Sequence, residues 1–325
     1  MKRNFLMQLG RGLLAATLAC SGVAMAQDYP NKPIRLVAPF APGGAVDILA
    51  RIIGERLSAQ YGQSVIVDNK PGASGHLGAQ LVATSPGDGY TLMVGTIGIH
   101  AAYASYSKLT YNPPTQLQPI MVIGESPNVV LVPANSKYKT FADFLADARA
   151  NAGKINYATA GAGSSVHMVT ELFQLAIGQR MNHVPYRGSG PALIDLISGQ
   201  VDVMFDNMSS GLPHVESGKL RVLAVTGSAR DPRLPNVPTI AETGVPGYSG
   251  TSWFSLAAPA SMPAALVAKL NQDVQRALAS PEVVARYDKL GMNYTPNSPA
   301  EAAAFFKSET VKWTRVIEAA KIQLD

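Results

Sequence analysis

Two glycine-rich segments hold the residues of this chain that are best suited to bind a ligand. Phe40-Ala41-Pro42-Gly43-Gly44 follows the apolar run 34–38, and Ala160-Gly161-Ala162-Gly163-Ser164-Ser165 follows Asn156-Tyr157-Ala158-Thr159. Each segment precedes a helical pattern, so each reads as strand, glycine turn and helix start. Glycine lets the backbone approach a ligand closely, and the first turn of a helix offers unpaired N–H groups with a partial positive charge. Each junction can therefore hold an anion without lysine or arginine, and we expect the two to face each other across a cleft.

Further ligand contacts are expected at strand ends and in a third glycine loop. Ser74 and Gly75 could add donors, and Thr96 ends an apolar run, where open α/β sheets bind their ligands. Asp206 follows the run Val201–Phe205; because a carboxylate repels a dianion, it should receive an amine, a hydroxyl or a ring N–H. The predicted ligand-binding residues are Phe40, Ala41, Gly43, Gly44, Ser74, Gly75, Thr96, Thr159, Gly161, Ser164, Ser165, His167 and Asp206.

Several of these residues have a purely structural alternative. Phe40 could pack in the core, Ser164 could serve only as a helix N-cap, and His167 could be a buried histidine without a ligand. Ser74, Gly75 and Asp206 could be turn or cap residues. Arg187 is the nearest basic candidate for the anion, although an arginine there could merely brace its loop.

The sequence predicts no catalytic residue, no metal and no cofactor. Ser164 and His167 lie at one helix start without an evident orienting acid, and no G-x-S-x-G elbow occurs. The five histidines show neither H-E-x-x-H nor another paired spacing, and a P-loop and a G-x-G-x-x-G in strand–helix context are both absent. An exported α/β enzyme is kept as the second function class.

Short β-branched runs alternate with helical patterns, which is typical of a mostly parallel sheet covered by helices. Three segments repeat apolar residues at helical spacing: 49–57, 166–177 and 266–278. The predicted strands are 34–37, 65–67, 92–94, 129–132, 201–205 and 222–225.

Residues 1–26 have the pattern of a secretory signal peptide. Basic residues precede the apolar run 13–19, and Ala24-Met25-Ala26 is a small-x-small cleavage site, so the mature chain should begin at Gln27. Cys20 permits a rival reading as an acylated lipoprotein cysteine. Without the leader, 24 basic residues face 22 acidic ones, a balance that does not favour nucleic acid as a partner.

Several longer segments resemble the Bug family, the periplasmic substrate-binding receptors of tripartite tricarboxylate transporters. They include Pro39-Phe40-Ala41-Pro42-Gly43-Gly44-Ala45-Val46-Asp47, Asn69-Lys70-Pro71-Gly72-Ala73-Ser74-Gly75 and Pro86-Gly87-Asp88-Gly89-Tyr90-Thr91-Leu92. The similarity continues through Tyr157–Ser164, His167, Pro185–Gly188, Gly199–Asp202 and Pro235–Thr239, and so covers essentially the whole mature chain.

The resemblance implies a two-domain periplasmic-binding-protein fold, each domain a mostly parallel sheet flanked by helices. Domain 1 would comprise 27–128 plus 250–325, and domain 2 would comprise 129–249. It also implies a periplasmic monomer that binds a small carboxylate in the interdomain cleft, largely through backbone N–H groups and ordered waters. Its partners would be the membrane permease subunits or, alternatively, a sensor kinase. Tyr103 and Ala104 stand where the family usually shows Asn-Pro, so the loop after His100 is expected to differ in shape.

Overall fold

The first part of the chain builds a parallel sheet from alternating strands and helices. The structure is a computed structural model that describes residues 29–324, so the predicted leader, its cleavage site and Cys20 lie outside the described residues. The elements are β1 (Ile34–Ala38), α2 (Ala45–Tyr61), β2 (Val65–Asn69), α3 (His76–Ala83) and β3 (Thr91–Thr96). β1 pairs in parallel with β2 on one side and β3 on the other. In α2 the apolar positions Leu49, Ile52, Ile53 and Leu57 are buried, which confirms the helical spacing.

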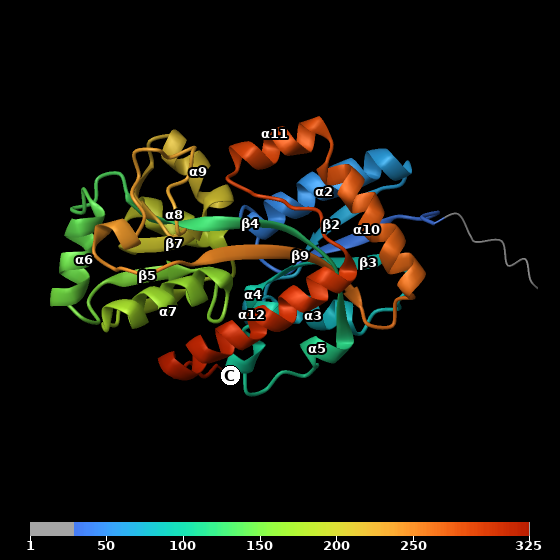
Figure 1. Ribbon diagram of the computed structural model, residues 1–325, viewed down its shortest axis with the longest axis horizontal. Coiled ribbons are helices and arrows are strands. Elements are labelled where there is room, and N and C mark those ends of the chain that lie inside the picture. Colours follow the sequence, from blue (N-terminus) through green and yellow to red (C-terminus); the bar gives the residue numbers. More distant parts are fainter. Residues whose placement is uncertain (1–28, 325) are drawn as a thin grey trace, which may run out of the picture.

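A second parallel unit follows the same plan. Its elements are β5 (Asn156–Thr159), α7 (Ser165–Ile177), β6 (Asn182–Pro185), α8 (Ser189–Ser198), β7 (Val203–Asn207) and α9 (Met208–Glu216). β5 pairs in parallel with β6 and β7. Phe173 and Phe205 pack with Phe144 of α6 (Phe141–Ala150) in an aromatic core of this unit. Figure 1 shows the two units as lobes side by side, the second in green and yellow.

Two antiparallel strands run through both lobes. β4 (Leu117–Pro133) pairs with β9 (Thr251–Pro259) over its first part, and with β7 and β8 (Leu220–Val225) from Asn128 onward. β9 in turn pairs with β3, so one curled sheet has the order β2-β1-β3-β9-β4-β7-β5-β6, with β8 also on β4. In Figure 1, β4 and β9 lie next to each other across the middle of the molecule.

A buried polar network fixes the place where the chain changes lobes. Asn128 N donates to Thr226 Oγ1 at 2.7 Å, and Thr226 Oγ1 donates to Gly250 O at 2.6 Å. Ser252 Oγ donates to Asn128 Oδ1 at 2.8 Å. Because buried polar groups need partners, this network holds β4, β9 and the segment after β8 in one register.

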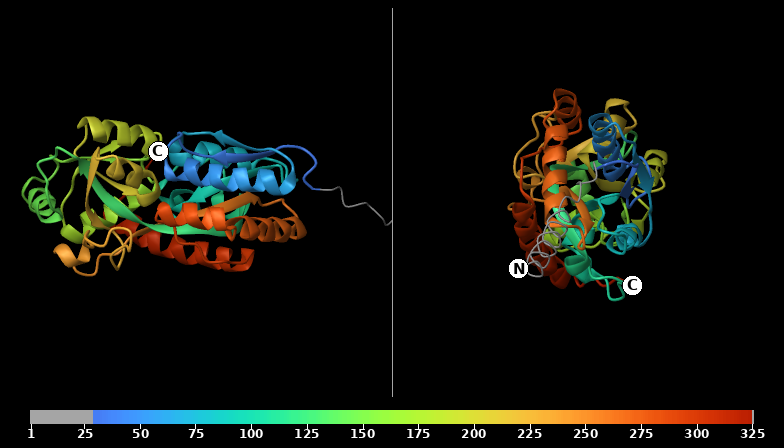
Figure 2. Two further views of the ribbon diagram at one scale, coloured as in Figure 1. Left: turned by 90° about the horizontal axis from the view of Figure 1, so that it is seen from above. Right: turned by 90° about the vertical axis from the view of Figure 1, so that its right-hand side faces the viewer.

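The remaining helices cover the first lobe and reach toward the second. They are α10 (Ala264–Leu278), α11 (Pro281–Lys289), α12 (Pro299–Ala320) and the short α4 (Ile97–His100) and α5 (Pro113–Gln116); single turns of 3₁₀ helix lie at Ala73–Gly75, Tyr103–Ser105 and Ala241–Thr243. α12 reaches from the first lobe to α7 (Figure 1). Figure 2 shows the two-lobed chain from two further sides, with α12 among the red segments. Among residues 29–324, none of the helices combines the length and the apolar character that a membrane crossing needs.

The mixed α/β class is confirmed, but the expected strand set was incomplete. β6, β9 and the first half of β4 were not predicted, and the expected run 201–205 is shifted, because β7 starts at Val203 and extends to Asn207. β9 lacks an alternating pattern since Ser252–Pro259 is buried on both faces. Such a strand has no period-2 signal in the sequence.

Candidate functional site

Four helices, each of nine residues or more, begin at one small cavity between the lobes. Its volume is about 20 Å³, which is enough to hold at least one water molecule or a small polar group. We call it the helix-end cavity. Its lining comprises Gly44, Ala45 and Val46 at the start of α2, Ser164 and Ser165 at α7, Ser189 at α8, Asn207 at α9, and Phe40, Thr96, Ala160 and Phe254.

The electrostatics of the helix-end cavity favour a small anion. No lysine, arginine or histidine lines it, whereas the converging helix starts direct N–H groups and the positive ends of their dipoles toward it. Thr96 Oγ1 and Asn207 Oδ1 are buried and have no hydrogen-bond partner within residues 29–324. Because buried polar atoms in folded proteins are normally paired, these two atoms point to a partner outside the chain, such as a ligand or a water molecule.

A larger cavity of about 470 Å³ adjoins the first and shares Phe40 and Ala160 with it. We call it the mouth cavity. It is lined further by Pro71–Gly75 and Leu77 of the first lobe and by Gly161, Ala162 and Pro185–Arg187 of the second. Ser74 has left-handed backbone angles, φ 49° and ψ 37°, and its hydroxyl lies directly against Gly161 of the second lobe. A Cβ on Gly161 would come within 2.6 Å of Ser74 Oγ, so this approach requires glycine.

The loops of the two lobes touch directly around these cavities. Ala41 N donates to Arg187 O at 2.9 Å, and a Cβ on Gly44 would lie 3.3 Å from Ser189 Cβ. A Cβ on Gly98 of α4 would lie 2.6 Å from Gly163 O. The lobes are therefore closed on each other, which accounts for the small volume of the helix-end cavity.

Eight of the thirteen residues predicted to bind a ligand line one of the two cavities. They are Phe40, Gly44, Ser74, Gly75, Thr96, Gly161, Ser164 and Ser165. Ala41 and Gly43 lie in the same loop but contact the protein: Gly43 N donates to Asp47 Oδ2 at 3.1 Å. Thr159 is buried, with Oγ1 2.7 Å from His183 Nε2. The two glycine junctions are thus brought together, as the sequence indicated.

Asp206 does not reach either cavity, so the structure gives no support to its direct contact with a ligand. It lies inside β7, fully buried, and its two carboxylate oxygens accept from Ser189 Oγ and Ser210 Oγ, each at 2.6 Å. Burial raises the pKa of Asp206 to about 6, against the opposing hydrogen bonds from these serines and Asn207. Asp206 therefore orients the hydroxyl group of Ser189, which does line the helix-end cavity.

His167 also faces away from the cavities. Its Nδ1 accepts from Gly163 N at 2.9 Å, and its ring stacks on His183 with centroids 4.3 Å apart. Its Nε2 is 3.5 Å from Glu171 Oε1. Burial alone would raise the pKa of Glu171, but His167, Tyr157 and Arg180 together lower it to about 2. The imidazole thus shapes the turn before α7, while Ser164 caps this helix by accepting from His167 N at 3.3 Å.

Sequence reasoning missed a third junction of the same kind. Tyr186-Arg187-Gly188 joins β6 to α8, and Ser189 at its end lines the helix-end cavity. The serine between two glycines was a usable signal for this junction. Because β6 was not among the predicted strands, however, the segment was not recognised as a strand, a turn and a helix start. Asn207 was missed because the strand was expected to end at Phe205.

Tyr106 joins the two lobes next to the mouth cavity. Its hydroxyl donates to Ala162 O at 2.5 Å. Burial raises the pKa of Tyr106, and a hydrogen bond with the Ser74 side chain opposes this rise. The loop that carries Tyr106 also pairs with the C-terminal segment, where Leu324 N donates to Ser105 O at 2.7 Å. This loop contains the departure from the family pattern at Tyr103 and Ala104.

We expect Tyr106→Phe to accelerate ligand release. A neutral hydrogen bond contributes about 0.5–1.5 kcal/mol, so losing the bond to Ala162 should raise the dissociation rate roughly two- to tenfold. Stopped-flow dissociation of a bound carboxylate measures this rate. Tyr103→Phe is the matched control, since the Tyr103 hydroxyl has no hydrogen-bond partner within residues 29–324. Equal rates in both variants would show that the Tyr106 bond does not hold the lobes together.

The curled mixed sheet, with two lobes closed around converging helix starts, defines a periplasmic-binding-protein fold. Among solved structures, the chain superposes on Rpa4515 of R. palustris with adipate with a TM-score of 0.88 and 39% identity, covering 91% of this chain and 99% of that chain. MatC from Rhodopseudomonas palustris with bound malate gives 0.85 at 34% identity, covering 89% and 100%. The periplasmic binding protein BugD gives 0.87 at 32% identity, covering 91% and 99%.

The sequence comparisons identify the family. The family model described as tripartite tricarboxylate transporter family receptor matches residues 49–322, and the chain belongs to this family. Protein BugT of Bordetella pertussis is 34% identical over 308 residues, 94% of each chain. A protein from the tcbD-tcbE intergenic region of Pseudomonas sp. is 38% identical over 305 residues, 94% of this chain and 91% of that one. The resemblance found in the motifs is thereby confirmed.

Proposed function

We propose that this protein is a periplasmic receptor that closes on one small carboxylate-bearing molecule and delivers it unaltered to the membrane subunits of a tripartite transporter. The observation that carries the proposal is the convergence of four helix starts on a cavity without basic side chains. A carboxylate group would occupy the helix-end cavity, and the rest of the molecule would extend into the mouth cavity. Family membership and the relatives solved with adipate and malate support this class of ligand.

Binding requires the lobes to open, because the loops of the two lobes touch around the helix-end cavity and leave little free space there. We place the domain boundaries where β4 and β9 pass between the lobes, with 27–128 plus 250–325 in one domain and 129–249 in the other. The ligand would enter the open cleft and the lobes would then close around it. Hinge closure of this kind is a common response of two-lobed binding proteins.

The expected affinity follows from the hydrogen bonds that the cavity can offer. Hydrogen bonds to a charged group contribute about 1.5–3 kcal/mol each. Four to six of them, less the cost of closure and ordering, could reach the roughly 8 kcal/mol of a micromolar site.

A screen of small carboxylates on protein freed of its co-purified ligand tests the proposal. Calorimetric titration should give saturable, one-to-one binding of at least one acid in a set that includes adipate and malate. Native mass spectrometry of the complex should recover the acid unchanged. If the protein converts the bound acid into a product, the alternative of an exported enzyme replaces the receptor.

The partner and the assembly state belong to the same proposal. We expect the mature protein to be a monomer released into the periplasm by cleavage after Ala26, rather than a lipoprotein held at Cys20. Its closed form would be recognised by the transporter permease; a sensor kinase that reads the same closed form is the alternative. Co-purification of the ligand-loaded receptor with detergent-solubilised membrane partners distinguishes the two.

We expect Arg187→Ala to weaken carboxylate binding only a few-fold. Arg187 is exposed at the rim of the mouth cavity, and exposed ion pairs contribute at most about 1 kcal/mol. Gly161→Val is the contrasting variant because its side chain would collide with Ser74 and the Tyr186 carbonyl. Calorimetry on both variants decides between backbone and side-chain recognition. If Arg187→Ala abolishes binding while Gly161→Val is tolerated, the anion is held by the arginine.

A further inference from the structure

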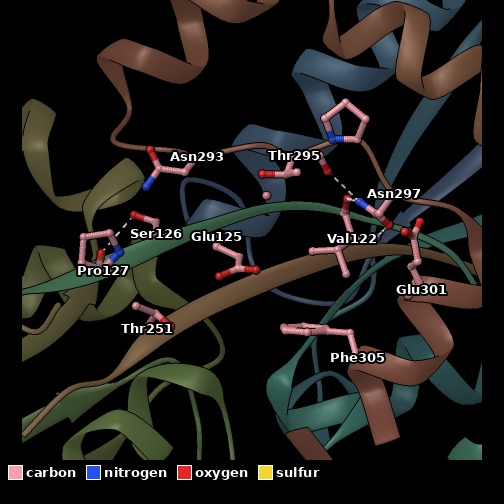
Figure 3. Close-up of a pocket in the computed structure, with 13 residues that line it drawn as sticks. Val122, Glu125, Ser126, Pro127, Thr251, Asn293, Thr295, Asn297, Glu301 and Phe305 are labelled. Carbon is pink, nitrogen blue, oxygen red and sulfur yellow. Dashed lines mark hydrogen bonds between the residues drawn. The ribbon is translucent and has the colours of Figure 1, made fainter. Parts of the chain in front are cut away.

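A separate pocket of about 420 Å³ lies against the two strands that pass between the lobes. We call it the β4–β9 pocket. Figure 3 shows its lining: residues of β4, Thr251 of β9, and the segment from Asn293 to Phe305. Its size falls within the range of small-molecule sites. None of the residues that line the helix-end and mouth cavities lines this pocket.

The charge of this pocket is opposite in kind to that of the helix-end cavity. Two carboxylates, Glu125 and Glu301, line it, and no lysine, arginine or histidine does. Both bonds that Glu301 Oε2 accepts come from Ser298, in a capping box at the start of α12. The Glu125 carboxylate is directed into the pocket (Figure 3) and has no hydrogen-bond or ion-pair partner within residues 29–324.

The lysine whose charge acts on Glu125 is paired with another carboxylate. Lys312 Nζ is 3.1 Å from Glu309 Oε1, and Glu309 also accepts from the indole N–H groups of Trp253 and Trp313 at 2.8 and 2.7 Å. Although solvent reaches Glu125, the pocket walls withdraw part of its carboxyl from water. This burial raises the pKa of Glu125, and the charge of Glu309 adds to the rise while Lys312 opposes it. Glu125 is thus an acidic group at the pocket that has no direct hydrogen-bond or ion-pair partner among residues 29–324.

The other walls fit the apolar part of a small cation. Phe305 presents a ring, held by Trp253 at 5.2 Å between centroids, and Val122, Pro127 and Ala302 add aliphatic surface. An aromatic face next to a carboxylate attracts an organic ammonium group through both charge and cation–π contact. We propose that the β4–β9 pocket is a binding site for a small organic amine in its ammonium form, with the nitrogen at Glu125 and the hydrocarbon part on Phe305.

This site would be coupled to the carboxylate cleft, because its walls include both strands that pass between the lobes. An amine that prefers one lobe arrangement must shift the affinity of the cleft for its ligand, and the cleft ligand must shift the affinity for the amine by the same factor. The amine site does not depend on the proposed transport function, since it can be titrated in the absence of any carboxylate.

The test uses n-butylammonium chloride as the probe and 1-butanol as its neutral counterpart, titrated into the mature protein. Intrinsic fluorescence serves as a second readout, since Trp253 adjoins Phe305 and is one of only two tryptophans. We expect saturable butylammonium binding and none of butanol. Glu125→Gln should weaken binding roughly tenfold or more, because a charge-assisted hydrogen bond is lost. Phe305→Leu should weaken it several-fold.

Glu318→Gln is the matched control, since it removes the same charge from an exposed position on α12 that does not line the pocket. Circular dichroism confirms that each variant is folded. The proposal is overturned if the wild-type protein shows no saturable binding up to about 50 mM, far above the millimolar affinity of a weak specific site. It is also overturned if Glu125→Gln and Glu318→Gln bind the probe equally well.

Discussion

Gly190→Ala should reduce carboxylate affinity by roughly two orders of magnitude, about 3 kcal/mol, while the protein stays folded. Gly190 is the second residue of α8, and a Cβ there would overlap the carbonyl oxygen of Pro42 in the opposite lobe. The added methyl group therefore penalises the closed arrangement and leaves α8 itself unharmed. Alanine even favours a helix over glycine, so the thermal stability of the ligand-free protein should be unchanged or slightly higher.

Gly54→Ala is the matched control for this substitution. Gly54 lies within α2, and its added Cβ would meet Val65 and Val67 at 3.5 Å, an ordinary packing distance within one lobe. Titration calorimetry should give wild-type affinity for Gly54→Ala and a large loss for Gly190→Ala. Wild-type affinity in Gly190→Ala would mean that the Pro42–Gly190 contact is not part of the ligand-bound state.

The sequence predicts the glycine junctions correctly because their signal is local. A run of glycines between a β-branched stretch and a helical period implies a strand–turn–helix unit, and its helix start must offer free N–H groups. That two such units share one cavity depends on how β4 and β9 bring the lobes together. The sequence predicted these two strands incompletely. β9 is buried on both faces and gives no alternating pattern, and β4 was predicted only over 129–132.

Asp206 shows how a small error in a strand boundary changes a functional assignment. Alternate residues of a strand point to opposite faces, so the identity of the last strand residue decides which side chain reaches the crevice. With β7 ending at Asn207 instead of Phe205, Asn207 lines the helix-end cavity and Asp206 turns into the protein. The carboxylate of Asp206 suggested a ligand contact, but its position in β7 directs it to the Ser189 hydroxyl instead.

The burial of Asp206 predicts a characteristic pH dependence of stability. Its pKa is about 6 in the folded protein and near the ordinary 3.8 when unfolded, so the folded state binds the proton more tightly. The contribution of Asp206 to the free energy of unfolding is therefore largest below about pH 4 and is lost as the pH rises through 6. The difference corresponds to about 3 kcal/mol, at roughly 1.4 kcal/mol for each pH unit between the two pKa values.

Asp206→Asn removes this titration while keeping the size of the side chain. Subtracting the variant's free energy of unfolding in urea from that of the wild type, at pH 4.5, 5.5 and 7, isolates the contribution of this one residue. We expect the wild type to lose stability relative to the variant between pH 4.5 and 7.

The same ionisation should affect ligand binding. Because the carboxylate of Asp206 is separated from the helix-end cavity only by Ser189, its negative charge should also oppose anion binding. The wild type should then bind a monocarboxylate with a pKa below about 4, which stays ionised over this range, more tightly at pH 5.5 than at pH 7, whereas Asp206→Asn should bind it equally at both. If the difference in the free energy of unfolding between the wild type and Asp206→Asn does not change with pH, Asp206 is already ionised in the folded protein at pH 4.5.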